Sequence, residues 1–313
     1  MTKLNYHELG HGISRVDTFY VRPGLASCYL IEQNGHAAFI DCGTHYTVAS
    51  LVKLLDEKNI PIENLDYVIP THIHLDHAGG AGELMRLAPN AQLIVHPRGT
   101  RHMEDPSRLQ AGATAVYGEA EFKKHYSHLT PIEQQRIISA KDGFCLDFQG
   151  RKLTFLDTPG HAKHHVCIID KSSQGMFTGD TFGVAYPELS TPTATFIFPP
   201  SSPVDFDPSA WEESIDRLIA TGAQRAYLTH YGVVENLQVL AVMLKDTIKA
   251  FVQFTKNKPS HTELSTLVTD HLLRGAQQTG CLLNQQEITD ILQLDIDLIT
   301  QGLEVWIEKN NNN

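Results

Sequence analysis

Apolar and polar residues follow two different periods along the chain, and the change of period separates predicted strands from predicted helices. Helical spacing of apolar residues occurs at 48–58, 79–87 and 207–220. Alternation or short apolar runs, which are typical of strands, occur at 27–32, 36–41, 66–70, 92–96, 144–148, 153–157, 166–170, 175–178 and 226–229. Strands that alternate with helices predict an α/β fold.

Two segments lie outside this alternating pattern. Residues 98–138 are long, charged and of helical character, so we expect a helical insert at about 98–138. From residue 234 onward nearly all apolar positions have helical spacing, including 260–273 and 288–306. We therefore predict a domain of residues 1–233 and a C-terminal helical appendage of 234–313, with a disordered tail at 310–313.

Four of the six consecutive positions 72–77 carry side chains that bind metal ions well, namely His72, His74, Asp76 and His77. Alternate side chains of an extended segment share a face, so His77 projects away from the other three. One ion needs three or four protein ligands, and this segment could therefore begin two adjacent sites. Further donors follow predicted strands later in the chain, and these are His161, Asp180 and His230.

This ordered set resembles the motifs of the metallo-β-lactamase-fold hydrolase superfamily, and within it the glyoxalase II-like branch. The matching segments are 39–43, 71–80, 158–161, 178–180 and 228–230. The resemblance implies an αββα sandwich. It also implies that one metal ion is held by His72, His74 and His161, a second by Asp76, His77 and His230, and that Asp180 bridges the two.

The charges of this ligand set indicate which reaction it could catalyse. Two divalent ions beside two carboxylates leave a net positive charge, which lowers the pKa of a bound water to about 7. We expect zinc, with iron or manganese as alternatives, and a metal-bound hydroxide that attacks the ester-like or thioester carbonyl of a small molecule. Asp76 and Asp180 are the predicted catalytic carboxylates, Asp41 and His165 are predicted to orient ligands, and His164 is interpreted as a surface residue.

The substrate is less clear from the sequence. The region after residue 234 has few basic residues, so no glutathione-binding cluster can be placed there. Arg98 and Arg101 could bind an anion or form part of a solvated face. Tyr186, Phe196 and Phe198 could line a pocket or pack under their own loop.

Other functions compatible with the ligand set stay open. A lactone hydrolase is disfavoured because Gly183 stands where such enzymes commonly have tyrosine. A persulfide dioxygenase of the same fold would need one iron and a subset of these ligands. A non-catalytic metal-binding protein would need the fold but no turnover.

Composition limits the partners. The net charge of −11 over 313 residues argues against nucleic-acid and anionic-membrane binding, as no run is rich in Lys or Arg. No apolar run has membrane-spanning length and no export signal is visible, so we expect a cytoplasmic protein. The five cysteines lack C-x-x-C spacing, which disfavours a disulfide framework. The apolar helical appendage could bury a face in a homodimer.

Overall fold

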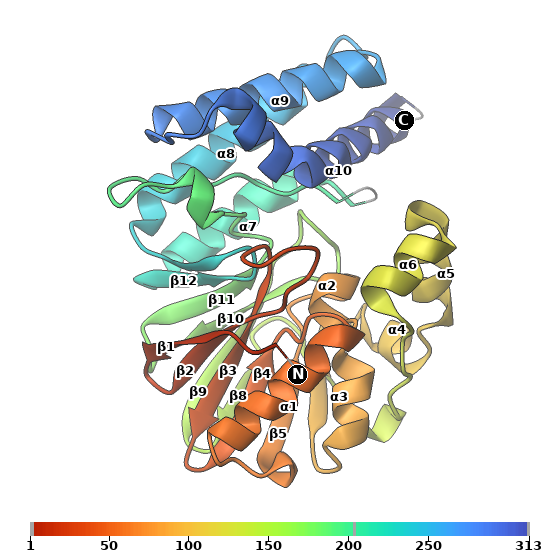
Figure 1. The fold of residues 1–313 in the computed structure, drawn as a ribbon, viewed down its shortest axis with the longest axis vertical. Helices are drawn as coiled ribbons and strands as arrows, with labels where there is room; N and C mark the ends of the chain where they lie inside the picture. Colours follow the sequence, from red (N-terminus) through yellow and green to blue (C-terminus); the bar gives the residue numbers. More distant parts are fainter. Residues whose placement is uncertain (1–2, 203–204, 312–313) are drawn as a thin grey trace. The chain divides into compact units, whose positions relative to one another are not determined.

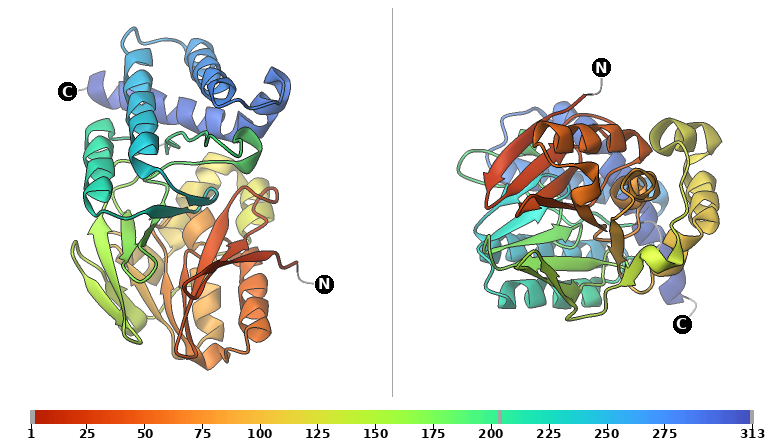
Figure 2. Two further views of the ribbon diagram at one scale, coloured as in Figure 1. Left: turned by 90° about the vertical axis from the view of Figure 1, so that its left-hand side faces the viewer. Right: turned by 90° about the horizontal axis from the view of Figure 1, so that it is seen from below.

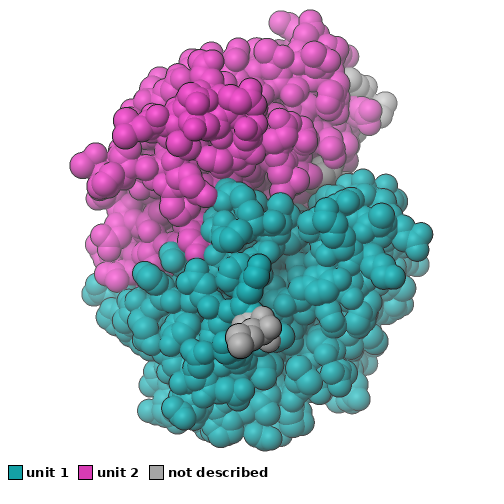
Figure 3. Space-filling model, viewed as in Figure 1, with its two compact units in different colours: residues 1–157, 164–179 teal, residues 158–163, 180–313 magenta. Residues whose placement is uncertain are grey.

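The computed structural model describes residues 3–202 and 205–311, and the chain divides into two compact units (Figure 3). Unit 1 consists of residues 1–157 and 164–179, and unit 2 of residues 158–163 and 180–313. The domain boundary expected at residue 233 stays a prediction.

Within the described part of unit 1, seven strands form a mixed sheet in sequence order. The strands β1 to β4 pair antiparallel, and β4 to β7 pair parallel. Their bounds are β1 (Tyr6–Gly10), β2 (Ile13–Asp17), β3 (Ser27–Gln33), β4 (His36–Ile40), β5 (Leu65–Ile69), β6 (Gln92–Val95) and β7 (Ile137–Ser139). The hairpin expected around Asn34 and Gly35 joins β3 to β4. The sequence pattern missed β1 and β2, because most side chains of β1 are exposed and the buried residues of β2 include the polar Ser14 and Asp17.

Helices α1 (Val48–Glu57), α2 (Leu75–Ala78) and α3 (Ala81–Leu87) follow β4 and β5 in the chain (Figure 1). Apolar side chains of α1 and α3 form one buried cluster with the sheet residues Leu30 and Phe39. The helix expected at 79–87 is present as α3, which begins at Ala81, and a break at 79–80 separates it from the short helix α2. Gly80 lies at this break because a Cβ there would come within 2.7 Å of the Thr44 carbonyl oxygen.

A second, antiparallel layer of unit 1 consists of β8 (Cys145–Phe148), β9 (Arg151–Asp157), β10 (Val166–Asp170) and β11 (Gly175–Gly179). Figure 2 shows the two layers of strands, one in red and orange and the other in light green. Aromatic side chains join the layers, with ring centroids 5.4 Å apart for Tyr29 and Phe177 and 6.0 Å apart for Tyr67 and Phe148. These two layers confirm the predicted sheet sandwich.

The insert is helical, as predicted. It contains α4 (Thr100–Glu104), α5 (Ser107–Tyr117) and α6 (Glu119–Tyr126). Phe122 and Tyr126 of α6 are buried against Leu75, which lies in the 72–77 segment itself. The insert is therefore attached to the predicted ligand loop by apolar packing.

Unit 2 contains the predicted C-terminal helices. Its elements are α7 (Pro208–Ala220), β12 (Arg225–Leu228), β13 (Gly232–Val234), α8 (Leu237–Phe254), α9 (His261–Gln278) and α10 (Gln285–Asn311). The hydroxyl of Ser260 accepts from the backbone N–H of Glu263 and begins α9 with a capping box. Helix α10 reaches Asn311, so the first two residues of the expected disordered tail are helical, and 312–313 lie outside the described residues.

None of the helices in the described ranges is both long enough and apolar enough to cross a membrane.

A buried ion pair supports the second layer of unit 1. The Arg151 guanidinium donates to both carboxylate oxygens of Asp170, at 3.1 and 2.5 Å, and to the His11 carbonyl at 2.7 Å. Replacing Arg151→Met leaves the Asp170 carboxylate buried without its cation, which we expect to lower the free energy of unfolding by about 3–5 kcal/mol. Denaturant titration measures the loss, and Lys152→Met, at the exposed next position, serves as the control. Equal midpoints for the two variants would contradict the assignment.

Candidate functional site

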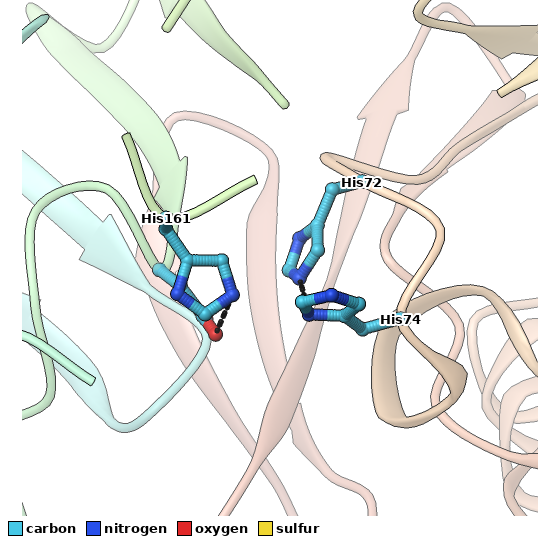
Figure 4. A group of neighbouring side chains, drawn as sticks. His72, His74 and His161 are labelled. Carbon is cyan, nitrogen blue, oxygen red and sulfur yellow. Dashed lines mark hydrogen bonds and ion pairs between the residues drawn. The ribbon is translucent and has the colours of Figure 1, made fainter. Parts of the chain in front are cut away.

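Unit 1 presents four of the predicted ligands in the segment that follows β5. The Nε2 atom of His72 lies 2.8 Å from Nδ1 of His74, and these two rings are drawn side by side in Figure 4. The Nε2 atom of His77 lies 3.7 Å from a carboxylate oxygen of Asp76. His72 and His77 are fully buried, whereas His74 and Asp76 are half-buried. The segment thus brings its four donors together, as the sequence predicted.

The Asp41 carboxylate binds this segment through hydrogen bonds to Thr71 and His77. Its carboxylate accepts from the Thr71 backbone N–H at 2.7 Å, from the Thr71 hydroxyl at 3.0 Å, and from Nδ1 of His77 at 2.9 Å. The proton on Nδ1 of His77 leaves the lone pair on Nε2, the atom that faces Asp76. Asp41 thereby has the position that its predicted orienting role requires.

Thr71 links the Asp41 carboxylate to the His72 ring by hydrogen bonds. Its hydroxyl donates to Asp41, so its oxygen can accept from Nδ1 of His72, which lies 3.2 Å away. That tautomer leaves the lone pair of His72 on Nε2, toward His74. Two imidazole nitrogens 2.8 Å apart either share a proton or both direct lone pairs at a cation, and the second arrangement fits a metal ion. The sequence analysis did not single out Thr71, although its place directly before His72 is a signal.

His165 packs directly on the ligand rings. It is fully buried, and its ring stacks on that of His72 with centroids 4.8 Å apart. Gly179 fits beside it because a Cβ at that position would lie 2.6 Å from Nε2 of His165 and 2.5 Å from the Thr71 hydroxyl. The φ of +46° at Gly179 adds a second reason for glycine. The backbone immediately before Asp180 therefore packs directly against the side chains of Thr71 and His165.

The interpretation of His164 as a surface residue was wrong. Its side chain is half-buried, and its ring centroid lies 5.5 Å from that of His74 and 6.1 Å from that of His72. Residue type and spacing alone could not show this, because the neighbouring rings come from a segment about 90 residues earlier.

Unit 2 presents the other three predicted ligands around Asp180. One carboxylate oxygen of Asp180 lies 3.3 Å from Nε2 of His161, and the other lies 3.6 Å from Nε2 of His230. All three side chains are buried. The Nδ1 atom of His161 donates to the Pro200 carbonyl at 2.7 Å, which leaves the lone pair on Nε2. Figure 4 includes the His161 ring.

Packing in unit 2 fixes the position of His161. The indole edge of Trp211 meets the His161 ring, with centroids 5.6 Å apart, and the indole N–H donates to the Thr181 carbonyl at 2.7 Å. A Cβ at Gly160 would lie 2.4 Å from the backbone of Trp211, so glycine is needed directly before His161. The sequence analysis missed the part played by Trp211.

The predicted substrate residues lie in different surroundings. Tyr186 is 2% exposed and its hydroxyl donates to the Asp295 carboxylate at 3.1 Å. Phe196 and Phe198 are also buried, so these aromatic side chains fit the packing alternative that the sequence left open. Arg98 and Arg101 are exposed on the insert. Burial lowers the pKa of the nearby His96, Asp157 opposes this effect, and Arg98 adds to it.

Comparison with known proteins places these motifs in a family. The metallo-beta-lactamase fold-containing protein ST1585 of Sulfurisphaera tokodaii is 25% identical over 216 residues, which are 68% of this chain and 75% of that protein. The human acyl-coenzyme A thioesterase MBLAC2 is 24% identical over 184 residues, 56% of this chain and 65% of that protein. An atrochrysone carboxyl ACP thioesterase of Aspergillus fumigatus is 28% identical over 171 residues, 55% of this chain and 40% of that protein.

Solved structures agree on the fold. The crystal structure of ST1585 matches with a TM-score of 0.62 at 23% identity, covering 86% of this chain and 99% of that one. The structure of TTHA1429 from Thermus thermophilus matches with a TM-score of 0.63 at 21% identity, covering 92% of this chain and 95% of that one. The model of the metallo-beta-lactamase superfamily matches residues 21–230, more than half of the chain. The chain therefore belongs to the metallo-β-lactamase superfamily.

Proposed function

We propose that this protein is a metal-dependent hydrolase that cleaves the thioester, or a related ester bond, of a small acyl substrate. The observation that carries the proposal is the state of the donors in both units. The rings of His77 and His161 are held by hydrogen bonds at Nδ1, so that Nε2 of each directs a lone pair at a neighbouring ligand, Asp76 or Asp180. In this arrangement lone pairs of the imidazole nitrogens and negatively charged carboxylate oxygens face one another and repel. A bound cation would remove that repulsion.

The donor chemistry fits divalent metals. Imidazole nitrogens and carboxylate oxygens suit zinc, iron and manganese, of which zinc is our first choice. We assign one ion to His72, His74 and His161, a second to Asp76, His77 and His230, and a bridging role to Asp180. Divalent ions held there would lower the pKa of a bound water to about 7 and polarise the carbonyl under attack.

The chain's own residues supply position and charge. Asp41 and the Pro200 carbonyl keep the protons of His77 and His161 on Nδ1, so that both rings bind as neutral donors. Asp180 and Asp76 contribute the negative charge that offsets two cations. The stacked His165 ring keeps His72 in one orientation.

A thioester is the preferred bond for two reasons. Two of the similar proteins are named as thioesterases, one for acyl-coenzyme A and one for an acyl carrier protein. The order of the ligand motifs also resembles the glyoxalase II-like branch, whose members hydrolyse a thioester, and this resemblance supports the proposal of a thioester substrate.

The lactone alternative is disfavoured by the surroundings of Gly183. This residue has a φ of +83°, and a Cβ there would lie 2.6 Å from Cδ2 of Leu244 and 2.8 Å from the Phe198 carbonyl. The tyrosine common in lactone hydrolases at this position does not fit unless this part of unit 2 moves.

Metal content tests the proposal first. We expect elemental analysis of the purified protein to find about two equivalents of zinc, iron or manganese per chain. The variant His74→Ala should lose metal and activity together. His261→Ala, which changes an exposed histidine paired with Glu304, should keep both. One equivalent of iron, with oxygen consumed on a persulfide, would select the dioxygenase instead.

Substrate class is tested by a panel of acyl-coenzyme A thioesters, oxygen esters and lactones of equal chain length. We expect the highest kcat/KM for a thioester, and loss of that activity in Asp180→Asn, because the variant removes a charge shared by two histidines. A fully metallated protein that turns over no member of the panel would favour the non-catalytic alternative.

Asp41→Asn tests the orienting network. An amide cannot accept all the hydrogen bonds that the buried carboxylate accepts, so we expect metal affinity to fall by about 10–100-fold. Titration against a chromophoric chelator measures the change. Asp216→Asn, an exposed carboxylate paired with Lys245, is the matched control and should bind metal like the parent. Unchanged metal affinity in Asp41→Asn would contradict the orienting role of the Asp41 hydrogen bonds.

A further inference from the structure

Three tyrosine side chains from separate parts of unit 1 pack together. Tyr20 lies between β2 and β3, Tyr117 ends α5, and Tyr126 ends α6. The hydroxyl oxygens of Tyr20 and Tyr126 are 2.5 Å apart, and the ring centroids of Tyr117 and Tyr126 are 5.9 Å apart. We call these three side chains the phenol cluster.

The phenol cluster lies beside the ligand segment. Leu75, between the predicted ligands His74 and Asp76, packs against Tyr126, with Tyr20 at the edge of the same group. Burial, and after it the negative charge of Asp76, raises the pKa of Tyr117 and Tyr20 above the ordinary value. The three groups therefore remain protonated, and each offers one O–H donor at neutral pH.

A count of protons shows what the cluster can bind. The Tyr20 and Tyr126 hydroxyls share one hydrogen bond, and the Tyr117 ring packs beside that of Tyr126. Two hydroxyls joined by one hydrogen bond use only one of their two protons between them, so at least one proton of the cluster can be donated to an acceptor outside it. Among the side chains that the structure describes, no hydrogen bond from these hydroxyls to another residue is present. The remaining donor is thus available to a water molecule or a ligand oxygen.

The surroundings of the cluster are apolar and open on one side. It packs against apolar side chains of the 72–77 segment, the insert and the stretch after α6, namely Leu75, Leu109, Ala113, Phe122 and Leu129. Tyr117 is 39% exposed, so solvent reaches the cluster from that side. Apolar walls with a few convergent hydroxyl groups are typical of a binding site for an acyl group.

We propose that the phenol cluster binds an oxygen of the acyl substrate next to Asp76, so that the insert supplies part of the substrate site. The oxygen is the carbonyl of the thioester or the carboxylate of the released acid, both of which accept a hydrogen bond from a phenol. The inference rests on the proposed function, since it takes the acyl group as the ligand. The tyrosines are positioning residues and hold no charge in this role.

Binding of octanoate, the product of an octanoyl thioester, tests the cluster without turnover. Calorimetry would be carried out on the metal-loaded full-length protein. We expect Tyr126→Phe to weaken octanoate binding by about tenfold or more, as expected for the loss of a hydrogen bond to a charged oxygen. In kinetics on octanoyl-coenzyme A, KM should rise more than kcat falls, whereas partial unfolding would lower the active fraction and leave KM unchanged.

Tyr46→Phe is the matched control. The Tyr46 hydroxyl donates to the Lys123 carbonyl of α6 and lies outside the phenol cluster. The substitution therefore removes a phenol hydroxyl without changing the cluster, and octanoate binding should be unchanged. Tyr117→Phe, at a partly exposed position, provides a second test if Tyr126→Phe fails to fold, and should also weaken binding.

The outcomes separate this inference from the proposed function. Parent-like octanoate binding in folded Tyr126→Phe and Tyr117→Phe, with thioester hydrolysis intact, would overturn the cluster's role alone. Absence of octanoate binding by the parent protein would overturn it as well. A metal-loaded parent protein that binds octanoate but hydrolyses no thioester would instead overturn the proposed function.

Discussion

The buried carboxylate of Asp41 is the contact on which the ligand segment of unit 1 depends. It is 1% exposed and accepts hydrogen bonds from the Thr71 backbone, the Thr71 hydroxyl and the His77 ring. A buried carboxylate is costly unless its oxygens are bonded, so removal of any of these donors would be unfavourable. The same bonds set the tautomer of His77 directly and that of His72 through Thr71. The cost of burying one charge is thus offset by the bonds that orient two ligands.

The parallel part of the first sheet explains why these residues meet. Asp41 follows β4 and the ligand segment follows β5, and these neighbouring strands run parallel, so both segments leave the sheet at the same edge. Side chains that follow adjacent parallel strands are brought together in this way in many α/β sites. Helices α1 and α3 cover one face of the sheet and the second layer of strands packs on the other, so the strands that lead to this edge are covered on both faces.

Local patterns predicted the buried parts of the fold well. Strands β3 and β4 were evident because their short buried apolar runs flank the turn at Asn34 and Gly35, and helices α8 and α9 because their apolar residues follow the helical period. Strand β1 was not evident because it is mostly exposed, and β2 was not evident because its buried residues include the polar Ser14 and Asp17. The ligand types were readable because few other roles require such a dense set of histidines and carboxylates.

Contacts between segments that are distant in the sequence could not be predicted from residue spacing. The hydroxyls of Tyr20 and Tyr126 are close in space but 106 positions apart, and neither residue has a neighbouring motif. His164 was misread for the same reason. Tyr186 drew attention by its aromatic loop, yet the structure turns its hydroxyl to Asp295. In each case the side chain's surroundings are set by packing between elements, which residue spacing does not report.

Anomalous X-ray scattering from crystals of the metal-loaded protein would test the central claim most directly. Data on either side of the zinc absorption edge would locate the bound ions without reference to activity. The account predicts two peaks, one about 2.0–2.2 Å from donor atoms of His72 and His74 and another at that distance from Asp76 and His77. No peak at these side chains, or peaks only elsewhere on the protein, would contradict it.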